Sequence, residues 1–393
     1  MQPLEGVTVV DPSQAIAGPL ATQILGDLGA DVVKIEHPER GDLCRGFTPD
    51  YGSMSAYFVS LNRNKRGVTL DLTTEDGQRI LRELVDGADV FVQNFSPGRA
   101  EKLGASYEEL SAVQEDLVYC DVSGYGEESP YSDRKAFDIV LQGQSGLMGI
   151  TGPAGGEPVR VGTSLSDISA AMTATYAILT ALYHRSNTGE GQYIDISLLD
   201  TSFQFLLYHV TNYFATGENP ERMGSKHPNL APYQAFRTAD SYIVIGVVSE
   251  YQWPGFCAAI DREEWVDDGR FATFTERVAN RETLDALLDD LFETRSTEAW
   301  IDQLQEHGVP CTPVNTVEEI VEDPHIEARG MIAEAEHPDH GTFKMAANPV
   351  NFSTLETDRC DPPPTLGEHT SEVLSELGYS RREIEELEGR GVL

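Results

Sequence analysis

The chain has 393 residues, 40% of them hydrophobic and 8% aromatic, and a formal net charge of −37. This length suffices for two domains with separate cores, and the apolar content is typical of a globular protein rather than a disordered one. Sixty-five acidic residues against 28 basic ones would repel nucleic acid and anionic membranes. We therefore expect no nucleic acid and no membrane among the partners, and the acid excess resembles the proteins of extreme halophiles.

Targeting and metal signals are weak. No apolar run reaches the roughly 20 residues that span a bilayer, and MQPLEGVTVVD lacks the basic region and long apolar core of a signal peptide. These observations favour a cytoplasmic protein. The five widely spaced cysteines are expected to be reduced thiols. His337 and His340 form an H-x-x-H in a loop-like segment, so a metal site is not expected there.

The first half of the chain alternates short β-branched strands with helical segments. Strands are predicted at residues 6–11, 31–36, 66–72, 89–95 and 117–126, and helices at 22–30, at 74–88 and from Asp167 onward. Such alternation predicts a parallel, doubly wound sheet. We therefore expect a Rossmann-like α/β large domain.

The composition changes after residue 200. Residues 201–230 are rich in Gly, Pro, Asn and charge and are predicted to be a linker, as are residues 326–350. Between them, residues 231–325 combine a strand pair with acidic helices, which predicts a smaller inserted α+β domain. The large domain is then expected to consist of residues 1–200 and a C-terminal return, 351–393, with a last helix at 370–377.

Common nucleotide and hydrolase motifs are missing from the sequence. The turn after the first strand, DPSQAIAGP, has one glycine where the dinucleotide fingerprint needs three. In GQSGL, Leu147 replaces the last glycine of the G-x-S-x-G nucleophile elbow, and no Walker sequence occurs. A Rossmann NAD site, a serine hydrolase and ordinary ATP chemistry are therefore unsupported.

Asp167, in the stretch SLSDISAAM, heads a run of small and apolar residues. An aspartate at a helix start commonly accepts hydrogen bonds from free backbone N–H groups and is favoured by the helix dipole. Alternatively, a carboxylate at such a position can be a nucleophile that forms covalent acyl intermediates. The residue alone leaves both interpretations open.

Several segments, taken in order, resemble one family. They are AGPLATQILGDLGADVVKIE, NRNKRGVTLDL, VQNFSPG, SGYGEESPY, LQGQSGLMGITG, GEGQYIDISLLD, RMGSKHPNLAPYQAFRTAD, DPHIEARGM and LGEHTSEVL. The ordered set covers essentially the whole chain and is similar to the class III CoA-transferases, which include formyl-CoA:oxalate and carnitine CoA-transferases and the α-methylacyl-CoA racemases. Any single segment is weak evidence, whereas the ordered set is specific.

The resemblance implies that Asp167 is the catalytic aspartate. In this family the carboxylate attacks the thioester of a donor acyl-CoA, and the reaction proceeds through aspartyl anhydride and aspartyl-CoA thioester intermediates to a free carboxylic acid. Acyl-CoA is then a substrate, with no permanently bound cofactor. The resemblance also implies an interlocked homodimer in which each ring-like subunit threads the other.

The resemblance further implies contacts to CoA and to the acid. The CoA positions fall on His37, Leu70, Asp71, Leu72, Thr73, Asn94, Phe95, Lys102, Lys135, Ala136, Phe137 and Asp138. The substrate positions fall on Ile16 and Ala17, and Ile16 stands where the oxalate-using branch has glutamine, which counts against oxalate. Lys102 and Lys135 are two of only six lysines, which fits phosphate contacts, although ordinary surface charges are the alternative.

Two rival functions remain at this stage. The racemases need a histidine where this chain has Phe137, and a phenyl ring carries no proton, so racemisation is disfavoured. A non-catalytic acyl-CoA-binding protein is disfavoured by Asp167. The halophile-like composition and the absent glutamine lead us to expect succinyl-CoA as donor and a C4 or C5 dicarboxylate such as mesaconate as acceptor. Arginines such as Arg45 could meet the distal carboxylate.

Overall fold

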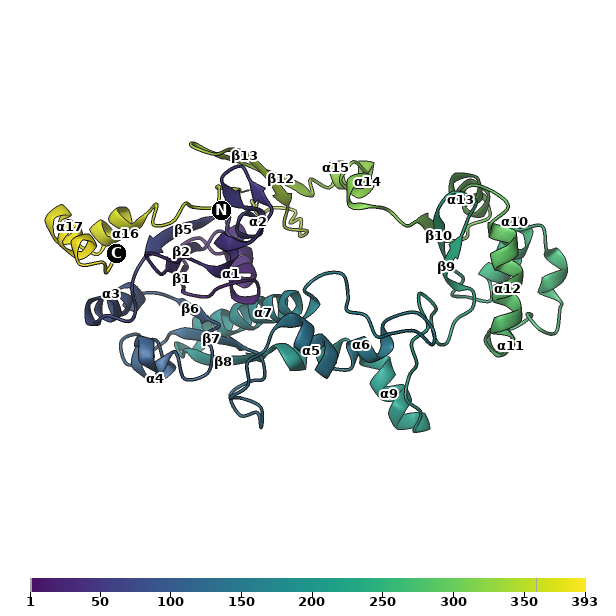
Figure 1. Cartoon of the computed structure of the whole chain (residues 1–393), viewed down its shortest axis with the longest axis horizontal. Helices are drawn as coiled ribbons and strands as arrows, with labels where there is room; N and C mark the ends of the chain where they lie inside the picture. Colours follow the sequence, from purple (N-terminus) through teal and green to yellow (C-terminus); the bar gives the residue numbers. More distant parts are fainter. Residues whose placement is uncertain (1, 358) are drawn as a thin grey trace. The chain divides into compact units, whose positions relative to one another are not determined.

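The computed structural model describes residues 2–357 and 359–393. By contacts within the chain, the protein divides into two units (Figure 1). The larger unit comprises residues 1–147, 160–216 and 325–393, and the smaller unit comprises residues 148–159 and 217–324. The smaller unit thus includes a short segment, 148–159, that lies outside the small domain expected from the sequence.

A six-stranded parallel sheet forms the centre of the larger unit. Its strands are β1 (Thr8–Asp11), β2 (Asp31–Glu36), β5 (Lys65–Thr69), β6 (Val90–Gln93), β7 (Val118–Ser123) and β8 (Gln192–Ser197). Their spatial order, β5-β2-β1-β6-β7-β8, is that of a doubly wound sheet, which confirms the predicted α/β architecture. The order of successive strands reverses between β1 and β6, which are themselves parallel, and the crevice at that point is where such sheets usually bind ligands.

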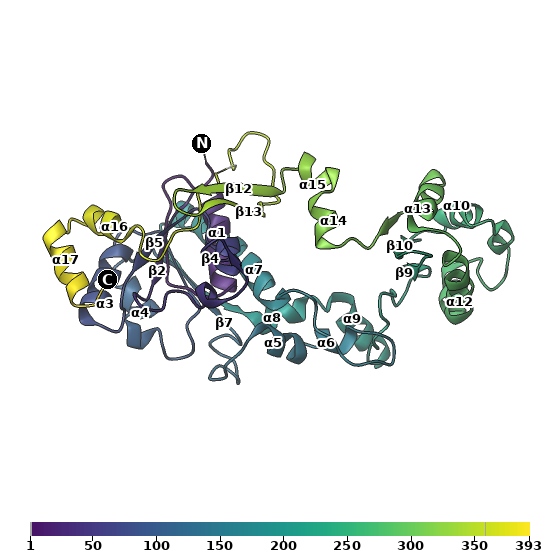
Figure 2. The same cartoon turned by 45° about the horizontal axis from the view of Figure 1, so that its top comes forward.

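Helices cover both faces of this sheet (Figures 1 and 2). Val9 and Val10 are both fully buried and point to opposite faces, as expected of neighbours in a strand. One face packs against α3 (Glu75–Val85), α4 (Tyr107–Ser111), α16 (Thr370–Glu376) and α17 (Arg381–Gly389). The other face packs against α1 (Ala17–Asp27), α5 (Asp138–Gln144) and α7 (Leu165–Thr188). The C-terminal residues therefore complete the large unit's core.

A satellite core lies beside α1. It joins α2 (Ala56–Leu61) and the hairpin of β12 (Ile332–His337) and β13 (Gly341–Ala346), with Cys44 and Phe58 fully buried inside it. The remaining elements of this part are η1 (Leu43–Gly46), β3 (Asp50–Tyr51), β4 (Met54–Ser55) and η2 (Glu101–Leu103). The segment 326–350, expected to be a linker, therefore contains a regular hairpin.

The segment expected as the first linker also contains helices. They are α8 (Leu198–Gln204) and α9 (Leu207–Thr216), which follow β8 directly. Helix α9 has no buried residue, although its sequence, LYHVTNYFAT, is largely apolar. The Gly-, Pro- and Asn-rich composition of residues 216–230 predicts a linker, but it does not extend back to these two helices.

The smaller unit has a three-stranded antiparallel sheet in the order β11-β10-β9. The strands are β9 (Tyr233–Arg237), β10 (Tyr242–Gly246) and β11 (Cys311–Pro313). Trp253, Phe256 and Trp300 are buried in its core. Its helices are α10 (Gln252–Ala259), η3 (Glu263–Val266), α11 (Phe274–Ala279), α12 (Arg281–Phe292), α13 (Thr297–Glu306) and α14 (Val317–Val321); α6 (Leu147–Ile150) and α15 (Pro324–Ala328) lie at the unit boundaries.

Helix α7 is the one described helix whose length and composition would allow it to cross a membrane. Forty-four per cent of its most apolar stretch is buried inside the protein, where Ala170, Ala171, Ala174 and Ile178 pack on the sheet. A buried core helix passes the same test, so the length alone does not indicate a membrane.

Candidate active site

Helices α1 and α7 bring the predicted substrate residues and Asp167 to one edge of the sheet. Each helix precedes a parallel strand, so both begin at the carboxyl ends of the strands, and the two pack against each other on the same face. Ile16 and Ala17 lie at the start of α1, and Asp167 lies in the first turn of α7. Burial and the charge of Asp42 raise the pKa of the Cys44 thiol, and the charge of Asp167 acts in the same direction, so Asp167 lies in the neighbourhood of Cys44.

Asp138 caps the helix that carries Asp167. One oxygen of its buried carboxylate accepts the backbone N–H of Ser166 at 2.8 Å, and the other accepts the Gln142 side-chain amide at 2.8 Å. The residue at the usual capping position, Ser164, makes no side-chain capping bond. A carboxylate from α5 therefore stabilises the positive end of α7.

The carboxylate of Asp167 is consequently available for chemistry. It is half-buried, and within residues 2–357 and 359–393 no hydrogen bond or ion pair to its side chain is found. Burial, and secondly the negative charge of Asp138, raise the pKa of Asp167 to about 7. A desolvated carboxylate without hydrogen bonds is more nucleophilic than one in water, which fits covalent catalysis rather than capping.

The loop between β1 and α1 is tied to the end of β6. Gln14 N–H donates to the Asn94 side-chain oxygen at 2.8 Å, and the Asn94 amide donates back to the Gln14 carbonyl at 2.7 Å. These bonds connect the ends of β1 and β6, between which the strand order of the sheet reverses. Asn94, predicted to contact CoA, therefore uses its side chain to fix the neighbouring loop.

His37 stands at the end of β2 beside the end of β5. Its Nε2 lies 3.2 Å from Arg40 Nη2, and Asp71 accepts both the backbone N–H and the hydroxyl of Thr73. Burial acts to raise the pKa of Asp71, but Thr73, His37 and Arg40 lower it below its ordinary value. The predicted CoA residues His37, Asp71 and Thr73 are thus neighbours, and Arg40 adds an exposed guanidinium that sequence reasoning missed.

The side chains of Leu70 and Leu72 lie in the core of the large unit. Only their backbone groups are therefore available to a ligand. Phe95 lines a hollow of about 330 Å³ together with Tyr107, Tyr119 and Tyr193. Phe95 is thus placed beside a space that an aromatic or apolar group could enter.

Lys102 and Lys135 are both exposed, as phosphate contacts require, but exposure also fits the alternative of ordinary surface charges. Ala136 packs against the end of β7, where a Cβ on Gly124 would lie 2.4 Å from the Ala136 Cβ, so glycine is needed for this approach. Phe137 is 71% exposed directly before Asp138. The segment 135–138 is therefore anchored by its small and acidic residues, with Lys135 and Phe137 pointing to solvent.

Arg45 is already paired. Its guanidinium donates to both oxygens of Glu36 at 2.6 Å and to the Pro364 carbonyl at 3.1 Å. This bidentate pair corrects the expectation that Arg45 is available for a distal carboxylate. Among the described residues no group of three His, Cys, Asp or Glu side chains is arranged to hold a metal ion.

Comparison with known proteins identifies the family of the chain. The profile of CoA-transferase family III matches residues 4–370. Succinyl-CoA:glutarate CoA-transferase of Homo sapiens is 37% identical over 395 residues, covering 100% of this chain and 90% of the relative. Succinyl-CoA:mesaconate CoA-transferase of Haloarcula hispanica is 36% identical over 388 residues, covering 96% and 97%.

Solved structures show the same fold. The crystal structure of a CAIB/BAIF family protein from Brucella suis superposes with a TM-score of 0.86 at 38% identity, covering 96% of this chain and 99% of that one. Family, fold and the resemblance drawn from the ordered segments thus agree over nearly the full length. The chain belongs to CoA-transferase family III and is a class III CoA-transferase that moves CoA between an acyl-CoA and a carboxylic acid.

Proposed function

We propose that the protein transfers CoA from succinyl-CoA to a C4 or C5 dicarboxylic acid, with mesaconate as the preferred candidate and Asp167 as the nucleophile. The observation that carries the assignment of Asp167 is its half-buried carboxylate, which accepts no hydrogen bond from the described part of the chain, while Asp138 caps the helix instead. The carboxylate is oriented by a rigid 24-residue helix that packs on the sheet.

The first half-reaction begins with attack of an Asp167 oxygen on the thioester carbon of succinyl-CoA. The carbon–sulfur bond breaks and leaves a succinyl-aspartyl anhydride and CoA thiolate. The thiolate then attacks the aspartyl carbonyl carbon, which forms an aspartyl-CoA thioester and releases succinate. A partly desolvated site favours both attacks because it removes water from the charged nucleophiles.

The second half-reaction reverses these steps with the acceptor. Its carboxylate attacks the aspartyl thioester, which releases CoA thiolate and forms a second anhydride. The thiolate then attacks the acceptor's acyl carbon, which yields the new acyl-CoA and restores Asp167. Each step exchanges acyl bonds of similar free energy, so no ATP is needed.

Relatives and the first loop both support a dicarboxylate acceptor. Relatives that match nearly the full chain are named for glutarate and mesaconate, both C5 dicarboxylates, and another is named for citramalate. Ile16 is half-buried against the satellite core beside Cys44, so it presents an apolar side chain where oxalate users place an amide. An apolar contact suits the carbon chain of a longer acid better than it suits oxalate.

We also propose the interlocked homodimer. Large apolar side chains are exposed on α7 and α9, including Tyr176 at 57%, Tyr183 at 74% and Phe214 at 79%. Helix α9 has no buried residue, and Leu207 and Phe214 are 65% and 79% exposed. A second copy of the chain would cover these side chains, since contiguous exposed apolar side chains commonly mark an interface.

Racemisation is less well supported. It needs a second acid–base group opposite the first, and the position before Asp138 holds the exposed Phe137. The remaining alternative, a non-catalytic acyl-CoA-binding protein, would bind CoA without ever forming a covalent adduct.

The test is CoA exchange in about 3 M KCl, at which screening should stabilise so acidic a chain. Succinyl-CoA is offered with mesaconate, glutarate, citramalate, malate, itaconate, oxalate and carnitine, and new thioesters are read by mass. We expect one dicarboxyl-CoA product that disappears in Asp167→Ala, and a hydroxylamine-sensitive adduct on Asp167 of the native protein. Proton exchange at the α-carbon of a 2-methylacyl-CoA without any transfer would favour the racemase, and CoA binding without adduct or exchange would favour the binder.

A further inference from the structure

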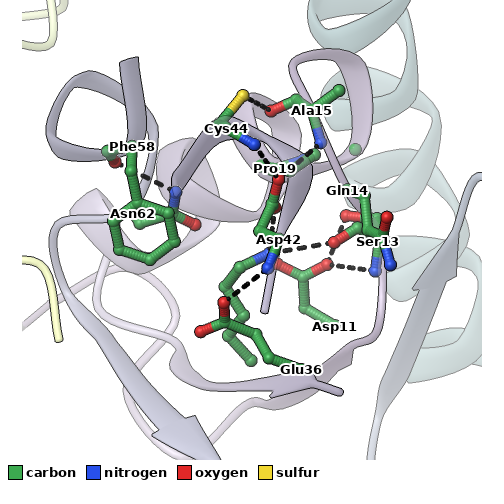
Figure 3. A network of polar contacts seen from close by, with 12 residues as sticks. Asp11, Ser13, Gln14, Ala15, Pro19, Glu36, Asp42, Cys44, Phe58 and Asn62 are labelled. Atoms are coloured by element: carbon green, nitrogen blue, oxygen red, sulfur yellow. Dashed lines mark hydrogen bonds and ion pairs between the residues drawn. The ribbon is translucent and has the colours of Figure 1, made fainter. Parts of the chain in front are cut away.

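A cluster of buried charges lies beneath the loop that leads into α1 (Figure 3). Lys34 and Asp42 form an ion pair of 2.9 Å with both side chains fully buried, and Lys65 and Asp11 form another of 3.1 Å. Two of the chain's six lysines are therefore placed in the interior. Buried ion pairs are often no more stabilising than apolar residues of similar size. Stability alone therefore does not explain why these two pairs are buried here.

The cluster holds the loop at three points. Lys34 donates to the Ser13 carbonyl at 2.9 Å, and Lys65 donates to the Pro19 carbonyl at 2.8 Å. Between them, one oxygen of Asp42 accepts the backbone N–H of Ala15 at 3.1 Å. The loop is also folded tightly on itself, because a Cβ on Gly18 would lie 2.3 Å from the Ser13 Cβ.

Ala15 has a left-handed backbone, with φ +64°. A residue with a Cβ adopts this conformation only where its surroundings enforce it, and such strain tends to gather at functional sites. Both sides of Ala15 are restrained: its N–H donates to Asp42, and its carbonyl accepts the Cys44 thiol at 3.5 Å. The same Asp42 oxygen accepts the Cys44 backbone N–H at 2.9 Å, so Asp42 controls both restraints.

We propose that Asp42, oriented by Lys34, is a positioning residue that holds Ala15 in its left-handed conformation and thereby places Ile16 and Ala17 against the acyl group carried by Asp167. The inference rests on the proposed role of Asp167. Ile16 and Ala17 follow Ala15 directly at the start of α1, which packs on α7, and the first turn of α7 carries Asp167. Burial alone would raise the pKa of Asp42, but Lys34 and the N–H groups of Cys44 and Ala15 lower it, so Asp42 stays an anion that can hold these donors.

The first test asks whether a glycine at position 15 replaces the function of Asp42. Asp42→Ala should lower kcat about 100-fold, as expected when reacting groups are misplaced by an ångström, while the Kd for CoA changes less than about threefold. Ala15→Gly adopts a left-handed backbone without a Cβ penalty, so it should restore about tenfold of kcat in Asp42→Ala and leave the native protein nearly unchanged.

Asp261→Gly is the matched control. Asp261 also has a left-handed backbone, with φ +56°, but it is exposed and belongs to the smaller unit. Its replacement should not restore kcat in Asp42→Ala. Recovery in both double variants would indicate general stabilisation, and recovery in neither would show that Asp42 does not act through Ala15; either result overturns the proposal.

A second test avoids leaving a buried charge without its partner, because such a charge strongly destabilises a single variant. Lys34→Met with Asp42→Asn removes both charges but keeps an acceptor oxygen for Ala15, whereas Lys34→Met with Asp42→Leu removes the acceptor as well. The first pair should retain kcat at least about tenfold better than the second at equal melting temperature. Equal kcat in the two proteins would overturn the proposal.

These outcomes are separable from failure of the proposed function. If Asp167 is not the nucleophile, Asp167→Ala remains active and forms the product whatever happens at Asp42. A further control is the buried pair of Arg63 and Asp27, 2.7 Å apart at the opposite end of α1. Asp27→Asn should lower the melting temperature without the selective loss of kcat.

Discussion

The carboxylate of Asp138 accepts the backbone N–H of Ser166, one residue before Asp167. Through this single bond, α5 supplies the cap of α7 and at the same time places a negative charge beside the proposed nucleophile. The two effects separate by substitution, because asparagine keeps an acceptor oxygen and alanine does not.

Asp138→Ala should lower the free energy of unfolding by about 1–2 kcal/mol, the usual effect of losing a helix cap. Asp138→Asn should recover most of this loss, since its oxygen still accepts the Ser166 N–H. Urea unfolding in molar KCl measures the difference. Equal stability of the alanine variant and the native protein would contradict the capping role.

The rate of aspartyl-CoA formation should depend on pH through Asp167. Its pKa of about 7, raised by burial and then by Asp138, predicts that kcat/KM for succinyl-CoA increases with pH and levels off above pH 7. Asp138→Asn removes the neighbouring negative charge, so the midpoint of the pH profile should move to lower pH. Burial remains, so the pKa of Asp167 should stay above its ordinary value of 3.8.

Asp121 provides the control for the pH dependence of kcat/KM. Burial and the neighbouring Asp195 raise the pKa of Asp121 to about 7 as well, in the wall of the hollow beside Phe95. Asp121→Asn should leave the midpoint unchanged if Asp167 governs the rate. If the midpoint of the pH profile disappears in Asp121→Asn but does not move in Asp138→Asn, Asp121 rather than Asp167 titrates, and the prediction is wrong.

Asp167→Asn should make the protein more stable at pH 8. The folded protein raises the pKa of Asp167, so ionisation costs stability as pH rises from the ordinary value of 3.8 through about 7. Removing the charge should therefore add roughly 1–3 kcal/mol to the free energy of unfolding at pH 8. The gain should vanish below about pH 3, where the carboxyl carries its proton in both the folded and the unfolded state; an equal gain at both pH values would exclude this origin.

The sequence predicts the sheet well and the distant contacts poorly. Residues 6–11 and 31–36 are β-branched runs around a helix, and they form β1 and β2 as expected. Helix α9 is not predicted, because its apolar residues are not followed by the polar positions of an amphipathic pattern and none of them is buried. The hairpin of β12 and β13 was missed because small alanines alternate with glutamates in AEAEH, which gives a weak strand signal.

The candidate site shows the same division. The helix start and the family resemblance predict a role for Asp167, whereas Asp138, which caps the helix, lies 28 residues before Ser166, and no local pattern reveals the bond. The scarcity of lysine suggested phosphate contacts for Lys102 and Lys135. The structure shows a different use for two of the six lysines, because Lys34 and Lys65 are buried and form ion pairs in the interior.

The apolar surface of α9 predicts the oligomeric state. If it contacts a second chain, Leu207→Glu with Phe214→Glu would place two charges in the interface, and light scattering should show a change from dimer to monomer. Glu218→Lys beyond the end of α9 is the control for a change of surface charge and should leave the dimer intact. A native protein that is monomeric at micromolar concentration would remove the basis of the interlocked assembly.

The formal charge of −37 predicts that salt stabilises the fold. Repulsion among exposed carboxylates acts over about 10 Å at 0.1 M ionic strength but only about 3 Å at 1 M, so added KCl should remove most of it. The melting temperature should therefore rise steeply up to about 1 M KCl and more slowly beyond, since little repulsion is left to screen. Potassium chloride and potassium acetate at equal ionic strength should act alike below 1 M if screening is the cause. A melting temperature that is constant across this range, or that follows the anion rather than the ionic strength, would show that the carboxylate surface does not limit stability.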